Sequence, residues 1–488
     1  MWRKAISERR ATLVMSEEQF KQFRSQLLKD DGLERAAFLF LGRHELGDRL
    51  ELFAHRMMTP ADSDYRQQHG TVVEPGPEYV LETFAAFNRC ETPVYLHAHS
   101  HPFSTQASFS GIDERYRPGE VESLKQYVSL ADNTVNAQYA RLVYGRDETG
   151  FTADCLDLAG APVAVIDAIR IVGSNGLRTL TSGSIKTAAA SDAQALAGER
   201  LDRNIRWLGE EGQMRLCRTH LVICGLGGIG SALVANASGL GFRRLTLVDP
   251  DRVEPSNLNR LFGAVRKDVG QQKVEVMARQ LKRIDPETEV YTVAKPLNDA
   301  AAREAIVRGD LIICGLDSIE ARLDAQILAA RHLKPLLDLG SGIILEGSSR
   351  RVAQMGAQAS FYIPGGPCLL CQGLDPSRII SAEHREMRRA IGYVEGTDET
   401  PPSVITINSI IAGIGMDLVV KYLTGFAAYP AYLRYDLLSH ATHEYSFDKR
   451  QECPVCGEDG VEGKGSDESQ ILIPEDLRAG TRSINKPG

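Results

Sequence analysis

The sequence predicts an α/β protein with two main domains, the second of which is built on a doubly wound, mainly parallel sheet. Three observations support this prediction. Short apolar strands mix with helical patterns before residue 160, and from Arg206 onward strands and helices alternate, which is typical of a parallel sheet. The nine cysteines include two Cys-x-x-Cys pairs. In a reducing compartment this spacing indicates metal binding rather than disulfide bonding.

Length and composition narrow the function classes. A chain of 488 residues with 43% apolar and 25% charged residues can form two or three globular domains. Its net charge of −8 argues against nucleic acid as a partner. The longest apolar run, 404–420, is interrupted by polar residues, and the N-terminus lacks an apolar signal core. We therefore expect a cytoplasmic protein with no membrane partner.

The texture of the sequence suggests four segments. They are a first domain at 1–165, a linker at 166–200, a second domain at 201–457 and a polar tail at 458–488. In the first domain we expect strands at 36–42, 49–55 and 93–99 and a helix at 77–90. In the second we expect strand–turn–helix units at 219–241 and 310–333, strands at 243–251 and 289–297, and a helix at 269–286.

Three histidines mark the first domain. If 94–101 is a strand, His97, His99 and His101 point to the same side. Two imidazoles spaced in this way can reach one zinc ion, with Asp113 as a third ligand and an open position left for water. Ser110 could donate to a developing oxyanion. The alternative is a polar strand whose histidines face solvent.

The string His-x-His-Pro followed by Ser-x-x-Asp resembles the motif of JAB/MPN-type (JAMM) metallo-isopeptidases. The resemblance implies an N-terminal JAB/MPN α/β zinc metalloprotease domain in which His99, His101 and Asp113 hold a catalytic zinc ion. Eight residues separate the second histidine from Ser110, where the family usually has seven.

That family also uses a glutamate on an early strand as general base. The resemblance points to Glu34, which stands just before the first apolar strand, and Glu74 is the second choice. An ordinary solvent-exposed glutamate is the alternative. His97 is then an additional histidine that supports the site or the fold.

A glycine-rich turn opens the second domain. It follows a strand and begins a helix, so its backbone can approach phosphate and the helix N-terminus favours anions. The glycines are Gly225, Gly227, Gly228 and Gly230. Asp249 ends the next strand, where it can accept a hydrogen bond from a ribose hydroxyl. Alone, this pattern also fits a NAD-binding oxidoreductase.

A set of polar residues distinguishes the two interpretations. It comprises Asp249, Asp251, Asn257, Asn259, Arg260, Lys273, Asp317 and Arg322. A dehydrogenase has no need for so many charges beside its nucleotide. An adenylating enzyme must neutralise a triphosphate, hold magnesium and stabilise attack at the α-phosphate.

The order Asp-x-Asp, Ser-Asn-Leu-Asn-Arg, Val-Gly-x-x-Lys and Asp…Arg resembles the ThiF/MoeB/HesA family, relatives of ubiquitin-activating enzymes, over about 200–457. The resemblance implies a Rossmann-like adenylation domain that uses ATP and Mg2+. Its implied roles are ribose binding by Asp249, phosphate contacts by Asn257 and Arg260, phosphate bridging by Lys273 and magnesium binding by Asp317. Arg206 matches an arginine that reaches into the partner protomer, which implies a homodimer; a surface arginine is the alternative.

The two Cys-x-x-Cys pairs have the spacing of a zinc ribbon. Cys368, Cys371, Cys453 and Cys456 could supply four thiolates to a structural zinc ion. The family resemblance supports the same site. Two unrelated pairs are the alternative.

Many relatives carry a nucleophilic cysteine before the final helices, but the corresponding segment, 373–403, contains none. The reaction then stops at the acyl-adenylate, or an external nucleophile or a hydroxyl takes the acyl group. Ser403 is the candidate hydroxyl, and a plain helix N-cap is its alternative.

Together the two resemblances imply ATP-dependent activation of the C-terminal carboxylate of a ubiquitin-like protein, with zinc-dependent processing or deconjugation of that protein. The setting would be a bacterial ubiquitin-like conjugation system, with a conjugating enzyme as a candidate partner. Two alternatives stay open: activation of a sulfur carrier for cofactor or cysteine biosynthesis, and a non-enzymatic scaffold that binds a ubiquitin-like protein.

Overall fold

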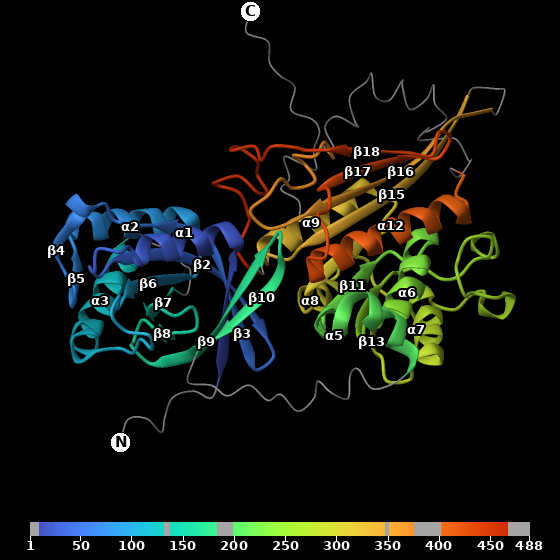
Figure 1. Cartoon of the computed structure of the whole chain (residues 1–488). Coiled ribbons are helices and arrows are strands. Elements are labelled where there is room, and N and C mark those ends of the chain that lie inside the picture. The colour runs from blue at the N-terminus through green and yellow to red at the C-terminus, as the bar shows by residue number, and fades with distance from the viewer. Residues whose placement is uncertain (1–8, 131–136, 183–198, 347–350, 375–401, 467–488) are drawn as a thin grey trace, which may run out of the picture. The chain divides into compact units, whose positions relative to one another are not determined.

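The computed structural model describes residues 9–130, 137–182, 199–346, 351–374 and 402–466 (Figure 1). The chain folds into two compact units. Unit 1 comprises Met1–Ala188, Ala330–Leu333 and Cys456–Glu468, and unit 2 the rest. Unit 1 is therefore assembled from segments that are far apart in the sequence.

Unit 1 is built on an eight-stranded sheet with the order β1-β3-β2-β6-β7-β8-β9-β10. Because β1 pairs with both β3 and β9, the sheet closes on itself. The strands are β1 (Arg10–Ser16), β2 (Ala36–Leu46), β3 (Arg49–Met58), β6 (Val94–Ser100), β7 (Gln138–Tyr144), β8 (Phe151–Asp157), β9 (Pro162–Gly173) and β10 (Gly176–Thr181). A separate hairpin pairs β4 (Tyr65–His69) with β5 (Val72–Pro75).

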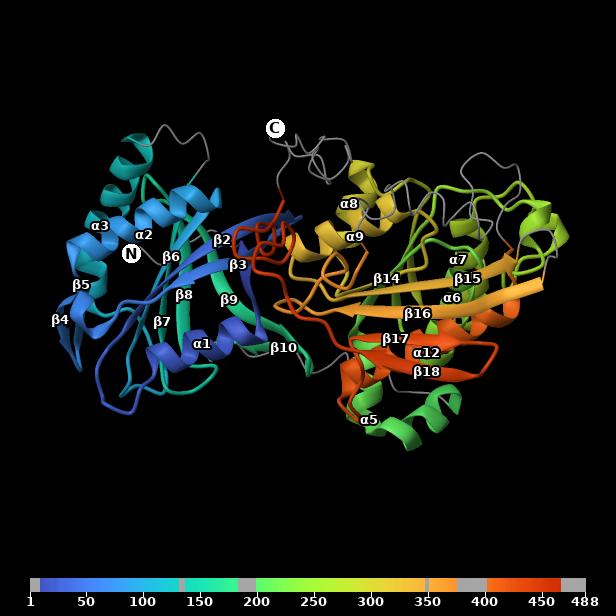
Figure 2. The same cartoon turned by 90° about the horizontal axis from the view of Figure 1, so that it is seen from above.

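Helices cover both faces of this sheet (Figure 2). α1 (Glu17–Leu27) packs on one face, and α2 (Pro77–Cys90) and α3 (Gly111–Leu130) pack on the other. Strand β2 shows why: Ala37, Leu39 and Leu41 join the α1 core, whereas the alternate residues Ala36, Phe38 and Phe40 join the α2–α3 core. A strand whose two faces are both buried reads as a continuous apolar run.

The expected linker at 166–200 differs from the structure. Strands β9 and β10 occupy most of its first half, and β9 pairs with β1, β8 and β10. The sequence PVAVIDAIRIVG is rich in β-branched residues and buries most of its length. The first unit therefore continues past 165, and the Ala- and Ser-rich stretch 183–198 lies outside the described residues.

The expected polar tail at 458–488 also differs, because its first part is a structural element of unit 1. Strand β6 begins opposite Leu41, so β2 from Gly42 onward has a free edge. Residues 463–466 cover that edge: the Gly42 amide donates to the Gly463 carbonyl at 3.1 Å, and the Ser466 amide donates to the Arg43 carbonyl at 3.0 Å. A side chain at position 42 would collide with the backbone of Lys464. Residues 467–488 are outside the described part.

Unit 2 contains a mixed sheet with the order β13-β12-β11-β14-β15-β16-β17-β18. The first five strands run parallel and the remaining neighbours pair antiparallel. The strands are β11 (His220–Cys224), β12 (Arg244–Val248), β13 (Glu289–Val293), β14 (Leu311–Cys314), β15 (Leu336–Glu346), β16 (Arg351–Tyr362), β17 (Tyr432–Asp436) and β18 (Ala441–Tyr445). The helices are α5 (Asp202–Arg218), α6 (Gly228–Leu240), α7 (Lys273–Ile284), α8 (Ala300–Val307), α9 (Ile319–Arg331) and α12 (Ile405–Thr424).

The parallel part confirms the expected doubly wound α/β arrangement. From β11 the chain moves to β12 and β13 on one side, then to β14 and β15 on the other. The order reverses between β11 and β14, and ligands of such sheets bind outside the carboxyl ends of the strands at this reversal. The antiparallel extension β16–β18 was not anticipated from the sequence.

Helix α12 contains the apolar run at 404–420. By length and composition it could cross a membrane, and it is the one such helix in the described part of the chain. Its apolar side chains are used inside unit 2, where it packs on α6, α5, β15 and β16, and 56% of its most apolar window is buried. It is a core helix of this unit.

Candidate functional site

The glycine-rich turn lies at the topological reversal of unit 2. Gly225 follows β11 with a φ of +84°, and α6 begins at Gly228. A Cβ at Gly230 would overlap the carbonyl oxygen of Gly225, and a Cβ at Gly228 would overlap the Asn408 side chain. Gly227 faces open space. The turn therefore exposes backbone at the helix N-terminus, where an anion is favoured.

Asp249 supports this turn from the end of β12. Its carboxylate accepts from the amides of Leu226 and Asp251. Lys273, at the start of α7, places Nζ 2.7 Å from Asp251 Oδ2 and 3.9 Å from Asp249 Oδ1. Burial raises the pKa of Asp249 despite the nearby Lys273 charge. The structure thus brings these three predicted residues together beside the turn.

Asn257 and Arg260 lie in the segment after β12. The buried Asn257 closes a short 3-10 turn by accepting from the Glu254 amide at 3.3 Å. Arg260 donates to the Ser256 carbonyl at 2.8 Å and to Asn259 at 3.0 Å, and its stem approaches Gly228. This places the guanidinium near the N-terminus of α6.

Asp317 follows β14, and its segment meets the glycine turn. The carbonyl of Gly315 and the side chain of Leu316 lie against Gly225. Asp317 is exposed, and two residues on from this contact it lines a cavity of about 580 Å³. An exposed carboxylate at this position can hold a hard cation such as Mg2+.

The same cavity is lined by Arg322, whose Nη1 lies 3.6 Å from Oδ2 of Asp338 on β15. Asp338 is 1% exposed. Burial raises its pKa, and the Arg322 charge opposes that shift. One carboxylate oxygen of Asp338 has no hydrogen-bond partner among the described residues.

Sequence reasoning missed Asn408, which connects the cavity to the glycine turn. Asn408 is 2% exposed. Its Oδ1 accepts from the Ser341 hydroxyl at 2.8 Å, and its Nδ2 donates to Ser403 Oγ at 3.1 Å. A lone asparagine within the apolar run 404–420 was the signal that could have found it, because a buried amide needs partners.

Ser403 therefore lies beside this network. The N-cap of α12 is Val404, and no side chain caps it, so the alternative of a plain N-cap at Ser403 is wrong. Most of the segment 373–403 lies outside the described residues.

Arg206 stands on α5, where it pairs with Asp202 at 2.9 Å and is 77% exposed at its side chain. The backbone of α5 breaks its helical course at Gly209, which has a φ of +72°.

The four cysteines of the two Cys-x-x-Cys pairs gather in one place. The Sγ atoms of Cys368, Cys371, Cys453 and Cys456 all lie within 4.8 Å of one another. None of the four forms a disulfide bond, and three of them are buried. Four converging sulfur donors are the chemistry that suits zinc.

In unit 1 a second group of metal-ligand types converges at the end of β6. Donor atoms of His99, His101 and Asp113 lie within 4.8 Å of one another. Nε2 of His99 is 3.2 Å from Oδ1 of Asp113, and Nε2 of His101 is 3.9 Å from Oδ2. Two imidazoles and a carboxylate fit a zinc ion. We call these three residues the His-His-Asp cluster.

Backbone pairing brings Glu34 to this cluster. The amide and hydroxyl of Ser100, just before His101, bond to Arg35, just after Glu34. Glu34 Oε1 then lies 3.8 Å from Nε2 of His101. Burial, together with the Asp113 charge, raises the pKa of Glu34 to about 7.

Ser110 orients one member of the cluster, and His97 lies beside it. Ser110 and Asp113 cap the start of α3 reciprocally, because the Ser110 amide donates to the Asp113 carboxylate and the Asp113 amide donates to Ser110 Oγ at 3.2 Å. This bond orients Asp113. His97, on the same strand side, stacks on Phe38 and places Nδ1 3.1 Å from Glu120. Glu74 pairs with Arg66 on the small hairpin instead.

Known proteins resemble a little over half of the chain. The SAMP-activating enzyme E1 of Haloferax volcanii is 26% identical over 55% of this chain and 93% of its own length. The molybdopterin-synthase adenylyltransferase of Escherichia coli is 29% identical over 56% of this chain and 100% of its own length. Among solved structures, E. coli MccB aligns with a TM-score of 0.45 at 20% identity, covering 55% of this chain and 74% of that one.

The model of the ThiF family matches residues 201–455, which is more than half of the chain and includes the glycine turn, Asp249, Lys273 and Asp317. The chain belongs to the ThiF family.

Proposed function

We propose that unit 2 adenylates the C-terminal carboxylate of a small ubiquitin-like or sulfur-carrier protein. The observation that carries this proposal is the convergence of the glycine turn, Asp249, Asp251 and Lys273 at the reversal point of a ThiF-family sheet. Relatives named as activating or adenylylating enzymes of SAMP, sulfur carriers and molybdopterin synthase support the same reaction class.

In this proposal ATP is the substrate. Its phosphates lie over the glycine turn, its ribose bonds to Asp249, and Lys273 and Arg260 neutralise phosphate charge. A magnesium ion held by Asp317 would add positive charge beside the same phosphates. The carboxylate oxygen of the carrier forms a bond to the α-phosphorus while the bond to pyrophosphate breaks. The products are an acyl-adenylate and pyrophosphate.

ATP–pyrophosphate exchange that depends on the carrier tests this function. Lys273→Met should lower the exchange rate about 100-fold, because a charge beside the reacting phosphates is lost. Lys282→Met, on the same helix but bonded to the Pro286 carbonyl, should leave the rate unchanged. Exchange that survives Lys273→Met would contradict the proposed site. A nucleotide site that binds ATP but supports no exchange would favour the scaffold alternative. A site that binds NADH but not ATP would favour the oxidoreductase alternative.

We propose Ser403 as the hydroxyl acceptor of the acyl group, since its Oγ lies in the Asn408 network. Its Oγ would bond to the carrier's carbonyl carbon and lose its proton, while the bond from that carbon to AMP breaks and AMP leaves. Mass spectrometry after incubation with ATP and carrier should find an ester adduct that is absent from Ser403→Ala. An unchanged adduct in the variant would remove this role. Incorporation of sulfide into the carrier terminus would favour sulfur transfer, and amide-linked products would favour conjugation with the help of a conjugating enzyme.

We further propose that the protein works as a cytoplasmic homodimer in which Arg206 reaches the partner's nucleotide. Its exposed position on α5 supports this role. Mixing Arg206→Ala with Lys273→Met should restore part of the exchange activity, because one of the two mixed sites is intact. No restoration in mixed dimers would refute the role.

We propose that unit 1 is a zinc hydrolase of the JAMM type that trims or releases the same carrier. The carrying observation is the His-His-Asp cluster with Glu34 3.8 Å from His101. A zinc ion held by the cluster would supply a Lewis acid for the scissile carbonyl and make water more acidic. Glu34 takes the proton of the attacking water and returns it to the leaving amine. The Ser110 hydroxyl, held at the start of α3, donates toward the carbonyl oxygen.

Cleavage of a carrier with a C-terminal extension tests this second function. Glu34→Gln should keep the bound zinc and lose about 100- to 10,000-fold in rate, whereas His99→Ala should lose the zinc. Glu74→Gln is the matched control and should cleave normally. Undiminished cleavage by Glu34→Gln would show that the mechanism is misassigned.

A further inference from the structure

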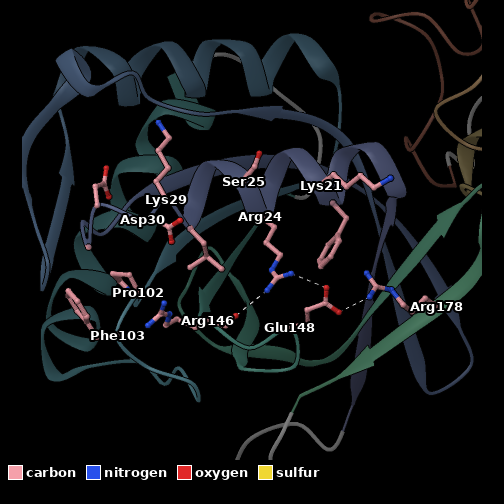
Figure 3. Close-up of a pocket in the computed structure, with 14 residues that line it drawn as sticks. Lys21, Arg24, Ser25, Lys29, Asp30, Pro102, Phe103, Arg146, Glu148 and Arg178 are labelled. Carbon is pink, nitrogen blue, oxygen red and sulfur yellow. Dashed lines mark hydrogen bonds and ion pairs between the residues drawn. The ribbon is translucent and has the colours of Figure 1, made fainter.

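Unit 1 contains a groove of about 940 Å³ that neither proposed reaction uses directly (Figure 3). Helix α1 forms one wall with Phe20 and Arg24, and the loop after it continues this wall from Leu28 to Gly32. The facing wall comes from Pro102 and Phe103 and from the turn between β7 and β8. Apolar side chains therefore line the groove on both walls.

Both of these loops are adjacent in sequence to residues of the proposed hydrolase site. Residues 30–32 lead into Glu34, and Pro102 directly follows His101. The loop after β6, which contains Pro102 and Phe103, is fixed to the end of β7. The His101 amide donates to the Tyr144 carbonyl at 2.9 Å, and the Arg146 amide donates to the Ser104 carbonyl at 2.8 Å. The loops that line the groove thus lead directly to the proposed base and away from a metal ligand along the chain.

Cationic side chains outnumber anionic ones in the lining, five to three, in a chain whose net charge is −8. The eight are Lys21, Arg24, Lys29, Arg146 and Arg178 against Asp30, Asp31 and Glu148. Two of the anions are already neutralised within the protein. Glu148 bonds to Arg24 at 3.0 Å and to Arg178 at 2.6 Å (Figure 3), and Asp31 bonds to Arg35.

Two cations remain available for a ligand. Lys29 and Arg146 are exposed, and neither makes an ion pair within 4 Å in the described part of the chain. The backbone of Arg146 is held by Ser104 and by Arg24, which donates to its carbonyl at 3.2 Å, while its guanidinium extends beside Pro102 and Phe103 (Figure 3).

Phe103 adds an apolar contact at the same end. Its side chain is 71% exposed, yet its ring edge lies against Gly32 and Gly70, where a Cβ would be within about 3 Å of it. An exposed aromatic ring that is fixed in place has a low entropic cost of binding. Aromatic and arginine side chains together are common anchors of protein interfaces.

We propose that this groove binds an extended acidic segment of the protein that unit 1 hydrolyses, with carboxylates at Lys29 and Arg146 and an apolar side chain on Phe103. The proposal rests on the hydrolase function proposed above and deepens it, since it assigns the chemistry of the substrate. Carboxylates pair with arginine in a bidentate manner, and the unpaired cations of the groove match that chemistry.

Fluorescence anisotropy with the full-length protein tests the proposal. The probe is a fluorescein-labelled ten-residue peptide of Glu, Gly and one Leu, and its control has Gln at every Glu. The acidic peptide should bind more tightly and weaken as salt increases. The Lys29→Glu/Arg146→Glu variant should weaken it about tenfold, because two attractions become repulsions. Phe103→Ala should weaken both peptides.

Arg89→Glu is the matched control, since Arg89 is an exposed cation of α2 outside the groove, and it should bind as the wild type does. Equal binding of the acidic and Gln peptides, or wild-type affinity in the double variant, would overturn the proposal. Binding of a labelled oligonucleotide to the groove, together with no binding of the acidic peptide, would also overturn it. Acidic-peptide binding without any hydrolysis would leave the groove standing and reject the hydrolase, whereas cleavage that is indifferent to the double variant would reject the groove alone.

Discussion

Substitution of Gly230 by alanine should damage the nucleotide site through sterics alone. The new Cβ would overlap the carbonyl oxygen of Gly225, far inside the 3.0 Å limit that real Cβ atoms keep. The obstacle is backbone in a turn with a φ of +84°, so no side-chain rotation can relieve it. Overpacking a well-packed site lowers the free energy of unfolding by about 1–3 kcal/mol. Because the obstacle here is backbone, we expect a loss of about 3 kcal/mol. For a unit of this size that lowers the melting temperature by about 6–12 °C.

Circular dichroism melting of Gly230→Ala and Gly227→Ala measures this effect. A Cβ at Gly227 meets open space, so Gly227→Ala should melt within about 2 °C of the wild type. If the proposed function is right, Gly227→Ala should still weaken ATP binding, because the methyl group would lie where the phosphates approach. If Gly230→Ala melts like the wild type, the close packing of the turn is not a constraint and the argument fails.

Three further predictions follow from buried groups. Cys453→Ser should lose one equivalent of zinc by plasma emission analysis and destabilise unit 2, whereas the buried control Cys217→Ser should keep the metal; equal zinc in both would exclude the four-thiolate site. Asn408→Leu should slow ATP–pyrophosphate exchange about tenfold, because Ser341 and Ser403 lose their partner, with the exposed Ser409→Ala as control; unchanged exchange would make Asn408 merely structural. His55 is held neutral, since burial lowers its pKa to about 4 even though it bonds to the Glu462 carbonyl. The contribution of neutral His55 to the free energy of unfolding is therefore complete above about pH 6.5 and is lost toward pH 4, by up to about 3 kcal/mol. His55→Gln should flatten this part of the curve of melting temperature against pH. An identical curve in the variant would contradict the lowered pKa.

The sequence was most informative where local pattern and tertiary contact agree. The helix at 77–90 could be predicted from its apolar stripe, and the strands near 36–42, 49–55 and 93–99 from short, mostly apolar runs that the structure buries. The linker and tail could not be placed well. Strand β9 pairs with β1, about 150 residues away along the chain. The segment 463–466 pairs with β2, and most of the sequence of the second unit lies between them. Periodicity reports which residues are buried but not which distant edge they cover.

The candidate site shows the same limit. Asp249, Lys273 and Asp317 carry their meaning in motif spacing, so they could be proposed from sequence. Asn408 could not, because its role comes from contacts with Ser341 and Gly228 that no spacing encodes. In unit 1 the strand alternation brought His99 and His101 together, but the bond that delivers Glu34 runs through Ser100 and Arg35.

The edge of β2 that residues 463–466 cover stays unpaired until the end of the chain has been translated. Ribosomes would release the strands of unit 1 long before the segment that completes them, since most of the second unit is translated in between. During that interval the β2 edge beyond Leu41 is open to pairing with another nascent chain. A fragment ending near residue 188 would keep that open edge permanently, so a soluble form of unit 1 should need residues 456–466 supplied, either as a fused segment or as a separate peptide.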